Sequence, residues 1–213
     1  MRKIAIYGAG GLGREIGQLI TQVNIQSPCW ELIGYYDDNI EKGKTISGQE
    51  ILGGINDLNA QNEELCLMVC IADCYVRTKI VQSIFNENIC YPSLIHPSVI
   101  MDSQEVVLGE GSIITAGNIL TSNISIGKHS IINLGCTIGH DVVVGDYCAI
   151  MPGVHLSGNI NIGEGTLLGT GARILQNLTI GRNARVGAGA VVTKNVDEST
   201  TVVGVPAQIM TNK

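Results

Sequence analysis

The sequence predicts two consecutive domains: an α/β domain of half-Rossmann type over residues 1–96 and a parallel β-helix over residues 97–213. Three observations support this prediction. An aliphatic residue stands at every sixth position from Leu108 to Val192, fifteen times in succession. Glycines recur at intervals of eighteen residues over the same stretch. The opening segment, KIAIYGAGGLGREIGQLI, has the pattern of a strand, a glycine-rich turn and a helix.

The sixfold repeat is typical of a β-helix in which three faces of six residues make one coil. Fifteen hexads at three per coil give about five coils. Two glycine series mark equivalent points in these coils: Gly109, Gly127, Gly145, Gly163 and Gly181, and Gly117, Gly135, Gly153, Gly171 and Gly189. Glycine at such points indicates corners that need positive φ or a close approach of two backbones. A sandwich of ordinary strands would instead show turns at irregular spacing.

The N-terminal part carries the pattern G-x-G-x-x-G at Gly8, Gly10 and Gly13, between a strand and a helix whose N-terminus can bind phosphate. A second strand, WELIGYYDD, ends in Asp37 and Asp38, where a nucleotide-binding fold carries its acidic residue. With LCLMVCIAD, three or four strands make half of a dinucleotide fold. We therefore expect a nucleotide or a sugar phosphate here rather than NAD. The alternative is that the glycines serve only a tight turn.

Charge and composition exclude several classes of protein. The net charge of −6 argues against a nucleic-acid-binding protein. No apolar run reaches the ~18 residues of a membrane span. The chain enters an apolar strand directly, without a signal sequence, so we expect a cytoplasmic protein. The seven cysteines include Cys66, Cys70 and Cys74 at a spacing that is not C-x-x-C, so we expect reduced thiols and no metal.

The two parts together resemble the sialic acid O-acetyltransferases and the bacterial UDP-4-amino-sugar N-acetyltransferases. The matching motifs are GAGGLG near the start, DD after the second strand, LIHPS at the junction, GHD in the repeats and VVGVPA near the end. The resemblance implies a left-handed β-helix and a homotrimer. It also implies direct transfer of an acetyl group from acetyl-CoA to a hydroxyl or amine of a sugar, either a sialic acid or a nucleotide-linked amino sugar. Both O- and N-acetylation fit the sequence.

The candidate catalytic residue is His140. Because Ile138 opens a hexad, His140 is its third residue and should project outward. The resemblance implies that His140 is the general base and that Asp141 is its carboxylate partner, which favours the protonated ring. The alternative is a polar residue at a surface turn, without a chemical role.

The resemblance also implies two sets of binding residues. By this resemblance, the residues that bind the sugar substrate are Gly10, Gly11, Leu12, Asp37, Asp38 and Asp73. Those that contact the pantetheine arm of the cofactor are Thr170 and Ala188. Charge gives a separate indication of a CoA phosphate site, because the stretch from Gly165 to Val196 holds four basic residues and no acidic one. These residues are Arg173, Arg182, Arg185 and Lys194. They could equally form a solvated face. Relatives carry a second, cofactor-contacting histidine where this chain has Ala149.

Two other functions remain open at this point. One is a trimeric scaffold that binds a nucleotide sugar without catalysis, since fold does not fix function. The other is a zinc enzyme of the carbonic anhydrase type, with His129, His140 and His155 as ligands. These histidines fall in hexads on three different faces, so we expect that they do not meet within one subunit.

Overall fold

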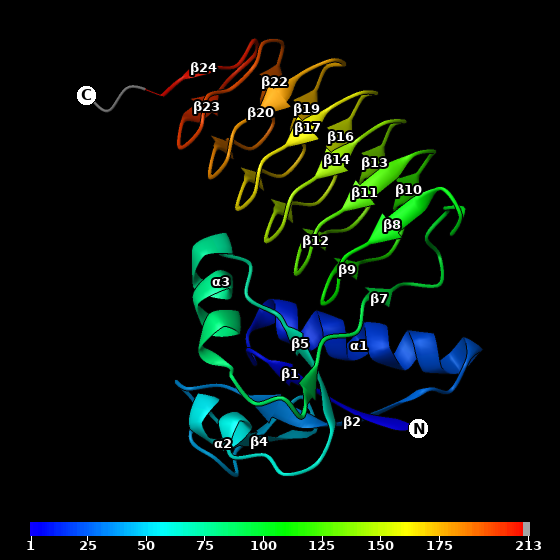
Figure 1. Cartoon of the computed structure of the whole chain (residues 1–213), viewed down its shortest axis with the longest axis vertical. Coiled ribbons are helices and arrows are strands. Elements are labelled where there is room, and N and C mark those ends of the chain that lie inside the picture. Colours follow the sequence, from blue (N-terminus) through cyan, green and yellow to red (C-terminus); the bar gives the residue numbers. More distant parts are fainter. Residues whose placement is uncertain (211–213) are drawn as a thin grey trace. The chain divides into compact units, whose positions relative to one another are not determined.

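The computed structural model describes residues 1–210, and the chain divides into two compact units, Met1–Pro97 and Ser98–Lys213 (Figure 1). Within the described residues, no helix is both long and apolar enough to cross a membrane.

The first unit is an α/β domain built on one sheet. Its strands are β1 (Arg2–Tyr7), β2 (Trp30–Tyr36), β3 (Thr45–Ile46), β4 (Gln49–Gly53), β5 (Leu65–Val69) and β6 (Ile89–Cys90). β7 (Leu94–Ile95) follows them in the chain and is not part of this sheet. Its helices are α1 (Gly11–Gln26), α2 (Ile55–Asn59) and α3 (Cys74–Ser83). The strand order is β3-β4-β2-β1-β5-β6, with every neighbouring pair parallel except the β3–β4 hairpin.

Three of the longer strands of this sheet, β1, β2 and β5, are those that the sequence predicts, whereas β4 is not predicted. Four strands have five or more residues, β1, β2, β4 and β5, and the central strand β1 is apolar and fully buried at Ile4, Ala5 and Ile6. The chain moves from β1 outward to β2 and β4 and then returns to β5 on the other side of β1. A parallel sheet with such a reversal binds ligands in the crevice at the carboxyl ends of its strands.

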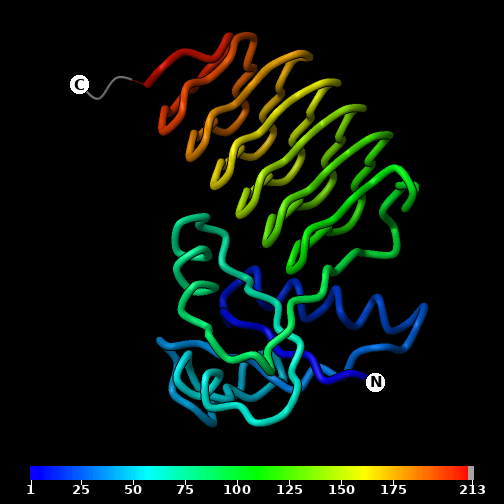
Figure 2. The backbone as a smooth tube through the Cα atoms, viewed as in Figure 1, coloured from blue at the N-terminus to red at the C-terminus, as the bar shows by residue number. Residues whose placement is uncertain are grey.

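The second unit is a parallel β-solenoid, a continuous coil in Figure 2. The β14 face holds β8 (Val106–Leu108), β11 (Ile124–Ile126), β14 (Val143–Val144), β17 (Asn161–Ile162) and β20 (Thr179–Ile180). The β13 face holds β10 (Ile119–Leu120), β13 (Thr137–Ile138), β16 (His155–Leu156), β19 (Arg173–Ile174) and β22 (Val191–Val192). The β15 face holds β9 (Ile113–Ile114), β12 (Ile131–Ile132), β15 (Ala149–Ile150), β18 (Leu167–Leu168), β21 (Arg185–Val186), β23 (Thr201–Val203) and an antiparallel end strand, β24 (Gln208–Ile209).

The sixfold register is confirmed by burial. All hexad positions from Ile114 to Val192 are at most 3% exposed, and Leu108 in β8, the edge strand of its face, is half-buried. From β8 to β19 each strand pairs with the strand eighteen residues later, so that Ile132 lies beside Ile150, and β21 pairs with β23 sixteen residues later. The side chains stack in columns along the solenoid and form its core, which explains why branched aliphatics suit this fold.

The two glycine series serve two different purposes. Gly117, Gly135, Gly153, Gly171 and Gly189 have φ between 65° and 75°, a left-handed conformation that glycine adopts without strain. In the series from Gly109 to Gly181 φ is not left-handed; there a Cβ would lie 2.4 to 2.7 Å from atoms of the next coil. Positive φ and close backbone approach, both expected at corners, therefore occur in separate columns.

Candidate active site

His140 lies in the corner between the β13 and β14 faces, in the turn formed by Gly139, His140 and Asp141. Ile138 and Val142, on either side, point into the core and are at most 1% exposed. The His140 side chain is 65% exposed, so the expected outward direction is confirmed. Asp141 has φ of 59°, a left-handed conformation that Asp and Asn tolerate better than most residues.

The His140 ring and the Asp141 carboxylate are in direct contact, with 2.7 Å between Nδ1 and Oδ2. An ionised carboxylate can only accept hydrogen bonds, so Nδ1 donates its hydrogen to Asp141. Nε2 then retains its lone pair, in the tautomer that a general base needs. The Asp141 side chain therefore reaches the ring and orients it.

Asn123 holds the other side of the same carboxylate. It lies one coil earlier, and its Nδ2 donates to Asp141 Oδ1 at 2.6 Å. The pKa of Asp141 lies below its ordinary value because the Asn123 amide and, next, the His140 ring stabilise the ionised form. The carboxylate is thus fixed from two sides although it is exposed.

Asn123 and Asp141 belong to a column of short polar residues along this corner. The column continues through Asn159 and Asn177, all four have φ between 52° and 62°, and Asn159 Nδ2 donates to Asn177 Oδ1 at 2.9 Å. We call these four residues the polar ladder. At this corner the ladder residues adopt the left-handed conformation that glycines adopt at the corner of Gly135 and Gly153. Asn and Asp tolerate this conformation better than most residues.

Gly158 lies against the His140 ring from the following coil. A Cβ at Gly158 would stand 2.4 Å from Nε2 and 2.5 Å from Cε1 of His140. The backbone of Gly158 is not in the left-handed region, so the turn itself does not require glycine. The missing side chain instead leaves room for the ring edge that carries the free lone pair.

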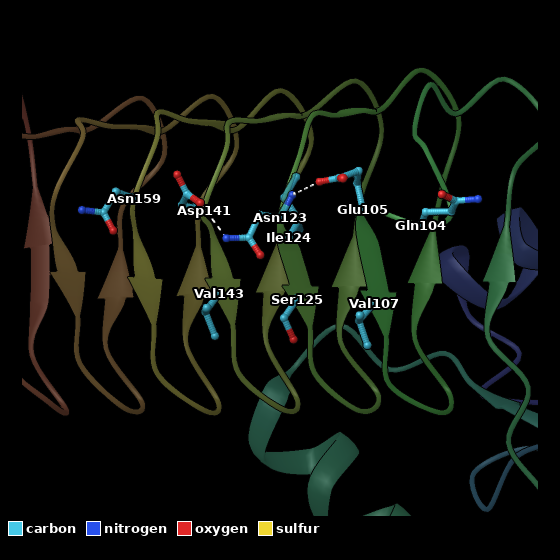
Figure 3. Close-up of a pocket in the computed structure, with 9 residues that line it drawn as sticks. All are labelled: Gln104, Glu105, Val107, Asn123, Ile124, Ser125, Asp141, Val143 and Asn159. Atoms are coloured by element: carbon cyan, nitrogen blue, oxygen red, sulfur yellow. Dashed lines mark hydrogen bonds between the residues drawn. The ribbon is translucent and has the colours of Figure 1, made fainter.

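A shallow groove of about 640 Å³ runs along the β14 face beside this corner. Figure 3 shows three ladder residues, Asn123, Asp141 and Asn159, along one edge of it. Val107, Ser125 and Val143 form a row on the strands. A second hollow of about 250 Å³ shares Asp141, Val143 and Asn159 and extends the groove toward Asn177. The carboxylate that orients His140 is therefore part of a continuous open surface.

Thr170 and Ala188 stand one above the other at the corner between the β15 and β13 faces. Both are exposed, and Thr170 O accepts a hydrogen bond from Gly189 N at 2.8 Å. Arg173 on the β13 face and Arg185 on the β15 face flank this corner. Two of the four expected cationic residues, Arg173 and Arg185, therefore lie within three residues of Thr170 and Ala188, the expected pantetheine site.

The other two cationic residues stand elsewhere. Arg182 lies at the corner between the β14 and β15 faces, and its Nη2 is 2.5 Å from Glu164 Oε2. Lys194 follows β22 at the corner between the β13 and β14 faces and is exposed. The four basic residues are therefore spread over the corners and faces of the last coils and do not form one cluster.

The remaining residues of interest in the solenoid are apart from each other. His155, on the β13 face, shares a hydrogen bond of 2.8 Å between its Nδ1 and Thr137 Oγ1. His129 is 3% exposed and stacks on Tyr147, with ring centroids 5.4 Å apart. Ala149, the first residue of β15, is 1% exposed. Within residues 1–210, no group of three His, Cys, Asp or Glu side chains is placed to hold a metal ion.

In the first unit, the glycine-rich turn follows β1 at the carboxyl edge of the sheet. A Cβ at Gly13 would stand 1.8 Å from Gly8 O, and one at Gly8, where φ is 99°, would meet Ile71 Cδ1 at 2.7 Å. At Gly10 and Gly11, by contrast, a Cβ would meet nothing within 4 Å. The protein's own packing therefore explains Gly8 and Gly13, whereas Gly10 and Gly11 face open space beside the half-buried Leu12 at the start of α1.

The acidic residues at this edge have partners in the fold. Asp37 Oδ2 accepts a hydrogen bond from Ala9 N at 3.0 Å, which ties the end of β2 to the glycine-rich turn. Asp38 accepts from the Tyr7 hydroxyl at 2.6 Å and from Ile55 N at 2.8 Å.

The same acidic residues line a hollow, and a third one, Asp73, begins a helix. Asp37 and Asp38 line a hollow of about 240 Å³ with Lys42 and Asp57. Burial, and then the bond to Asp38, raise the pKa of Tyr7. Asp73 is the N-cap of α3, where its side chain accepts from Val76 N.

Two residues that sequence reasoning missed are Asn123 and Gly158. Each lies eighteen residues from the His140–Asp141 turn, Asn123 before Asp141 and Gly158 after His140. The eighteen-residue period was itself visible, and Gly158 belongs to neither glycine series. A search one coil before and one coil after the turn would have found both.

Comparisons with known proteins agree with this description. Residues 3–84 match the family described as the PglD N-terminal domain, and residues 159–194 match the bacterial transferase hexapeptide repeats. No curated protein matches the chain.

Several solved structures are similar over the whole chain. WeeI from Acinetobacter baumannii AYE is 36% identical, with a TM-score of 0.88 over 99% of this chain and 100% of that one. The acetyltransferase domain of PglB from Neisseria gonorrhoeae FA1090, in complex with acetyl coenzyme A, is 28% identical, with a TM-score of 0.88 over 98% and 99%. PerB from Caulobacter crescentus, in complex with CoA and GDP-perosamine, is 29% identical, with a TM-score of 0.88 over 99% and 98%.

Proposed function

We propose that this chain, which belongs to the PglD-like family of hexapeptide-repeat sugar N-acetyltransferases, transfers an acetyl group from acetyl-CoA to the amine of a nucleotide-linked amino sugar. The single observation that carries the proposal is the outward His140–Asp141 pair, whose free Nε2 faces the space left by Gly158. Similarity to proteins solved with CoA, acetyl coenzyme A and GDP-perosamine supports the choice of substrates.

In this proposal His140 is the general base. The sugar nitrogen attacks the thioester carbonyl, the new C–N bond forms, and the C–S bond to CoA breaks. Nε2 takes the proton that the nitrogen loses and passes it to the departing thiolate. Asp141 stabilises the ring while it is protonated, and Asn123 keeps the carboxylate in place. A backbone N–H near the carbonyl would stabilise the oxyanion.

The two substrates are assigned to the two units. The first unit, residues 1–96 in our prediction, binds the nucleotide sugar over Gly10, Gly11 and Leu12, where the chain leaves open space and the start of α1 favours a phosphate. Asp37, Asp38 and Asp73 then act mainly by shaping this edge, through their bonds to the glycine turn, Tyr7 and α3.

CoA is assigned to the corner of Thr170 and Ala188. Arg173 and Arg185 flank this corner and would approach the phosphates, a role that suits guanidinium groups. Lys194 and the Glu164-paired Arg182 contribute less directly.

The proposal includes a left-handed coil and a homotrimer. Flat prism faces bury surface well by closed rotational symmetry, and the exposed Val107 and Val143 on the β14 face support such association. Sedimentation of the purified protein at micromolar concentration tests the trimer, and a monomer would refute it.

The decisive experiment replaces His140 with alanine and measures turnover with acetyl-CoA and a panel of GDP- and UDP-linked amino sugars. We expect a loss of about 10²–10⁴-fold, the usual contribution of a positioned base, with little change in acetyl-CoA binding. His155→Ala is the matched control and should keep most of the activity. Near-normal turnover of the His140→Ala variant would contradict the proposal. A panel of free sialic acids, run in parallel, distinguishes amine from hydroxyl acceptors.

A further inference from the structure

Two cysteines of the first unit lie side by side at the edge of its sheet. Cys66 in β5 and Cys90 in β6 are direct partners in the parallel pairing of these strands. Their Sγ atoms are 2.8 Å apart. Neighbouring strands are ~4.8 Å apart, which is within the Cα–Cα range of about 4.4–6.8 Å that a disulfide spans. The backbone therefore already has a separation that permits a bond between the two sulfurs.

Other buried cysteines are placed differently. Cys136 and Cys148, inside the solenoid, donate to backbone carbonyls, with 3.1 Å from Cys136 Sγ to Asn133 O and 3.1 Å from Cys148 Sγ to Gly163 O. Their thiols are used in the packing of the coils. Cys66 and Cys90, by contrast, face each other.

We propose that Cys66 and Cys90 form a reversible intramolecular disulfide by exchange with a low-molecular-weight disulfide such as oxidised glutathione. In the first step the thiolate of one cysteine attacks a sulfur of the small disulfide, and one small thiolate leaves. In the second step the other cysteine, after losing its proton, attacks the mixed disulfide and expels the second small thiolate. The protein loses two electrons and two protons, and the small disulfide becomes two thiols.

The surroundings indicate which cysteine reacts first. Cys66 is buried, and burial, followed by its hydrogen bond with Cys90, raises its pKa to about 12. Cys90 is half-buried, and Arg2 Nη2 donates to its sulfur at 3.4 Å. Cys90 is therefore the accessible thiol that meets the oxidant, and Cys66 is the thiol that resolves the mixed disulfide.

The bond would close a loop of the chain that contains α3. The segment between the two cysteines includes Asp73, the N-cap of this helix, and β6 is the edge strand of the sheet. A cross-link restricts the unfolded chain, so we expect the oxidised protein to unfold at a higher temperature than the reduced protein.

The test treats the reduced full-length protein with oxidised glutathione, blocks the remaining thiols, and analyses tryptic peptides without reduction. Cleavage after Lys44, Arg77 and Lys79 gives peptide 45–77, with Cys66, Cys70 and Cys74, and peptide 80–128, with Cys90. We expect these two peptides to be linked, a mass loss of about 2 Da in the intact chain, and reversal by dithiothreitol.

Single variants identify the partners. Cys66→Ser and Cys90→Ser should each abolish the link, whereas Cys70→Ser and the matched control Cys29→Ser should keep it. The proposal would be overturned by the absence of a link in the wild-type protein, by a link that survives Cys66→Ser, or by a stable glutathione adduct on Cys90 in place of the link. A cross-linked dimer on a non-reducing gel would overturn it as well.

Discussion

The Cβ position of Gly158 falls 2.4 Å from Nε2 of His140, although the two residues are in different coils of the solenoid. A side chain at this position would therefore meet the nitrogen that carries the lone pair. The ring is the flexible partner in this contact, since it is the exposed end of a side chain. A larger residue would displace the ring and leave the backbone in place.

We predict that Gly158→Ala lowers kcat by about 10²-fold or more, the usual cost of misplacing a reacting group by about 1 Å. The midpoint of thermal unfolding should change little, because the backbone of Gly158 is open to any L-residue. Steady-state kinetics and a thermal melt check the two parts.

Gly153→Ala is the control with the opposite expectation, a loss of stability without a loss of activity. Gly153 has φ of 68°, and a Cβ there would meet nothing within 4 Å. Alanine should cost about 1 kcal/mol of stability through the left-handed backbone and leave kcat near normal. If Gly158→Ala instead lost stability and kept its activity, the ring would not depend on this space.

Asn123→Ala should raise the pKa of Asp141 toward its ordinary value, since the Asn123 amide is the main cause of the lowered pKa. A lowered carboxyl pKa contributes stability at neutral pH that is lost as the pH falls through the folded-state value. In the variant the folded-state pKa of Asp141 approaches its unfolded-state value, so this pH-dependent contribution should become smaller. An NMR titration of the Asp141 carboxyl carbon measures the shift directly.

Asn159→Ala is the matched control, because Asn159 stands in the same ladder but donates to Asn177. It should leave the Asp141 titration where it is in the wild type. Equal shifts in the two variants would mean that the ladder acts as a whole and that the Asn123 contact has no special effect.

The orientation of His140 could be predicted from the sequence, but its support could not. The sixfold register and Ile138 place His140 outward, and the structure confirms this direction. Asn123 and Gly158 lie next to the His140–Asp141 turn only through the stacking of coils, so their effect depends on which residues face each other across the stack. Hydrophobic periodicity locates the core positions and gives little information about outward side chains at a corner.

Asp141→Asn should lower kcat, but by less than the His140→Ala change. Asparagine keeps the left-handed turn and the contact geometry with Asn123, whereas it removes the charge that stabilises the protonated ring. Its amide can also present a hydrogen to Nδ1, which would favour the wrong tautomer. Activity measured against pH, with circular dichroism as a check of folding, tests this expectation. Unchanged kcat at every pH would show that the carboxylate has no part in the reaction.

In the first unit, Gly11→Ala and Gly13→Ala should separate binding from folding. Alanine at Gly11 meets no atom within 4 Å, so the variant should fold normally and show a raised KM for the nucleotide sugar. Alanine at Gly13 would stand 1.8 Å from Gly8 O, a backbone atom that cannot move aside, so this variant should lose stability. A normal KM in Gly11→Ala would place the substrate elsewhere.

The same unit shows a second limit of sequence reasoning. β1, β2 and β5 leave a hydrophobic pattern in the sequence, whereas the five-residue β4 is not predicted and β3 and β6 have only two residues each. The G-x-G-x-x-G pattern also does not show that Gly8 and Gly13 serve packing and that Gly10 and Gly11 do not. This distinction depends on the atoms around each glycine: Gly8 lies against the Cys70–Ile71 segment, Gly13 lies against Gly8, and Gly10 and Gly11 have no atom close to their Cβ positions.

The His140–Asp141 turn depends on residues of the coils before and after it, and this affects how the site can be inherited or transplanted. Asn123, the His140–Asp141 turn and Gly158 come from three successive coils, so no single hexapeptide holds the proposed catalytic arrangement. Gain or loss of a whole coil beyond Gly158 would leave it intact. An insertion of one residue between Asn123 and Gly158 would destroy it. The smallest segment that keeps this arrangement around His140 is therefore a block of three coils, without the residues assigned to the two substrates.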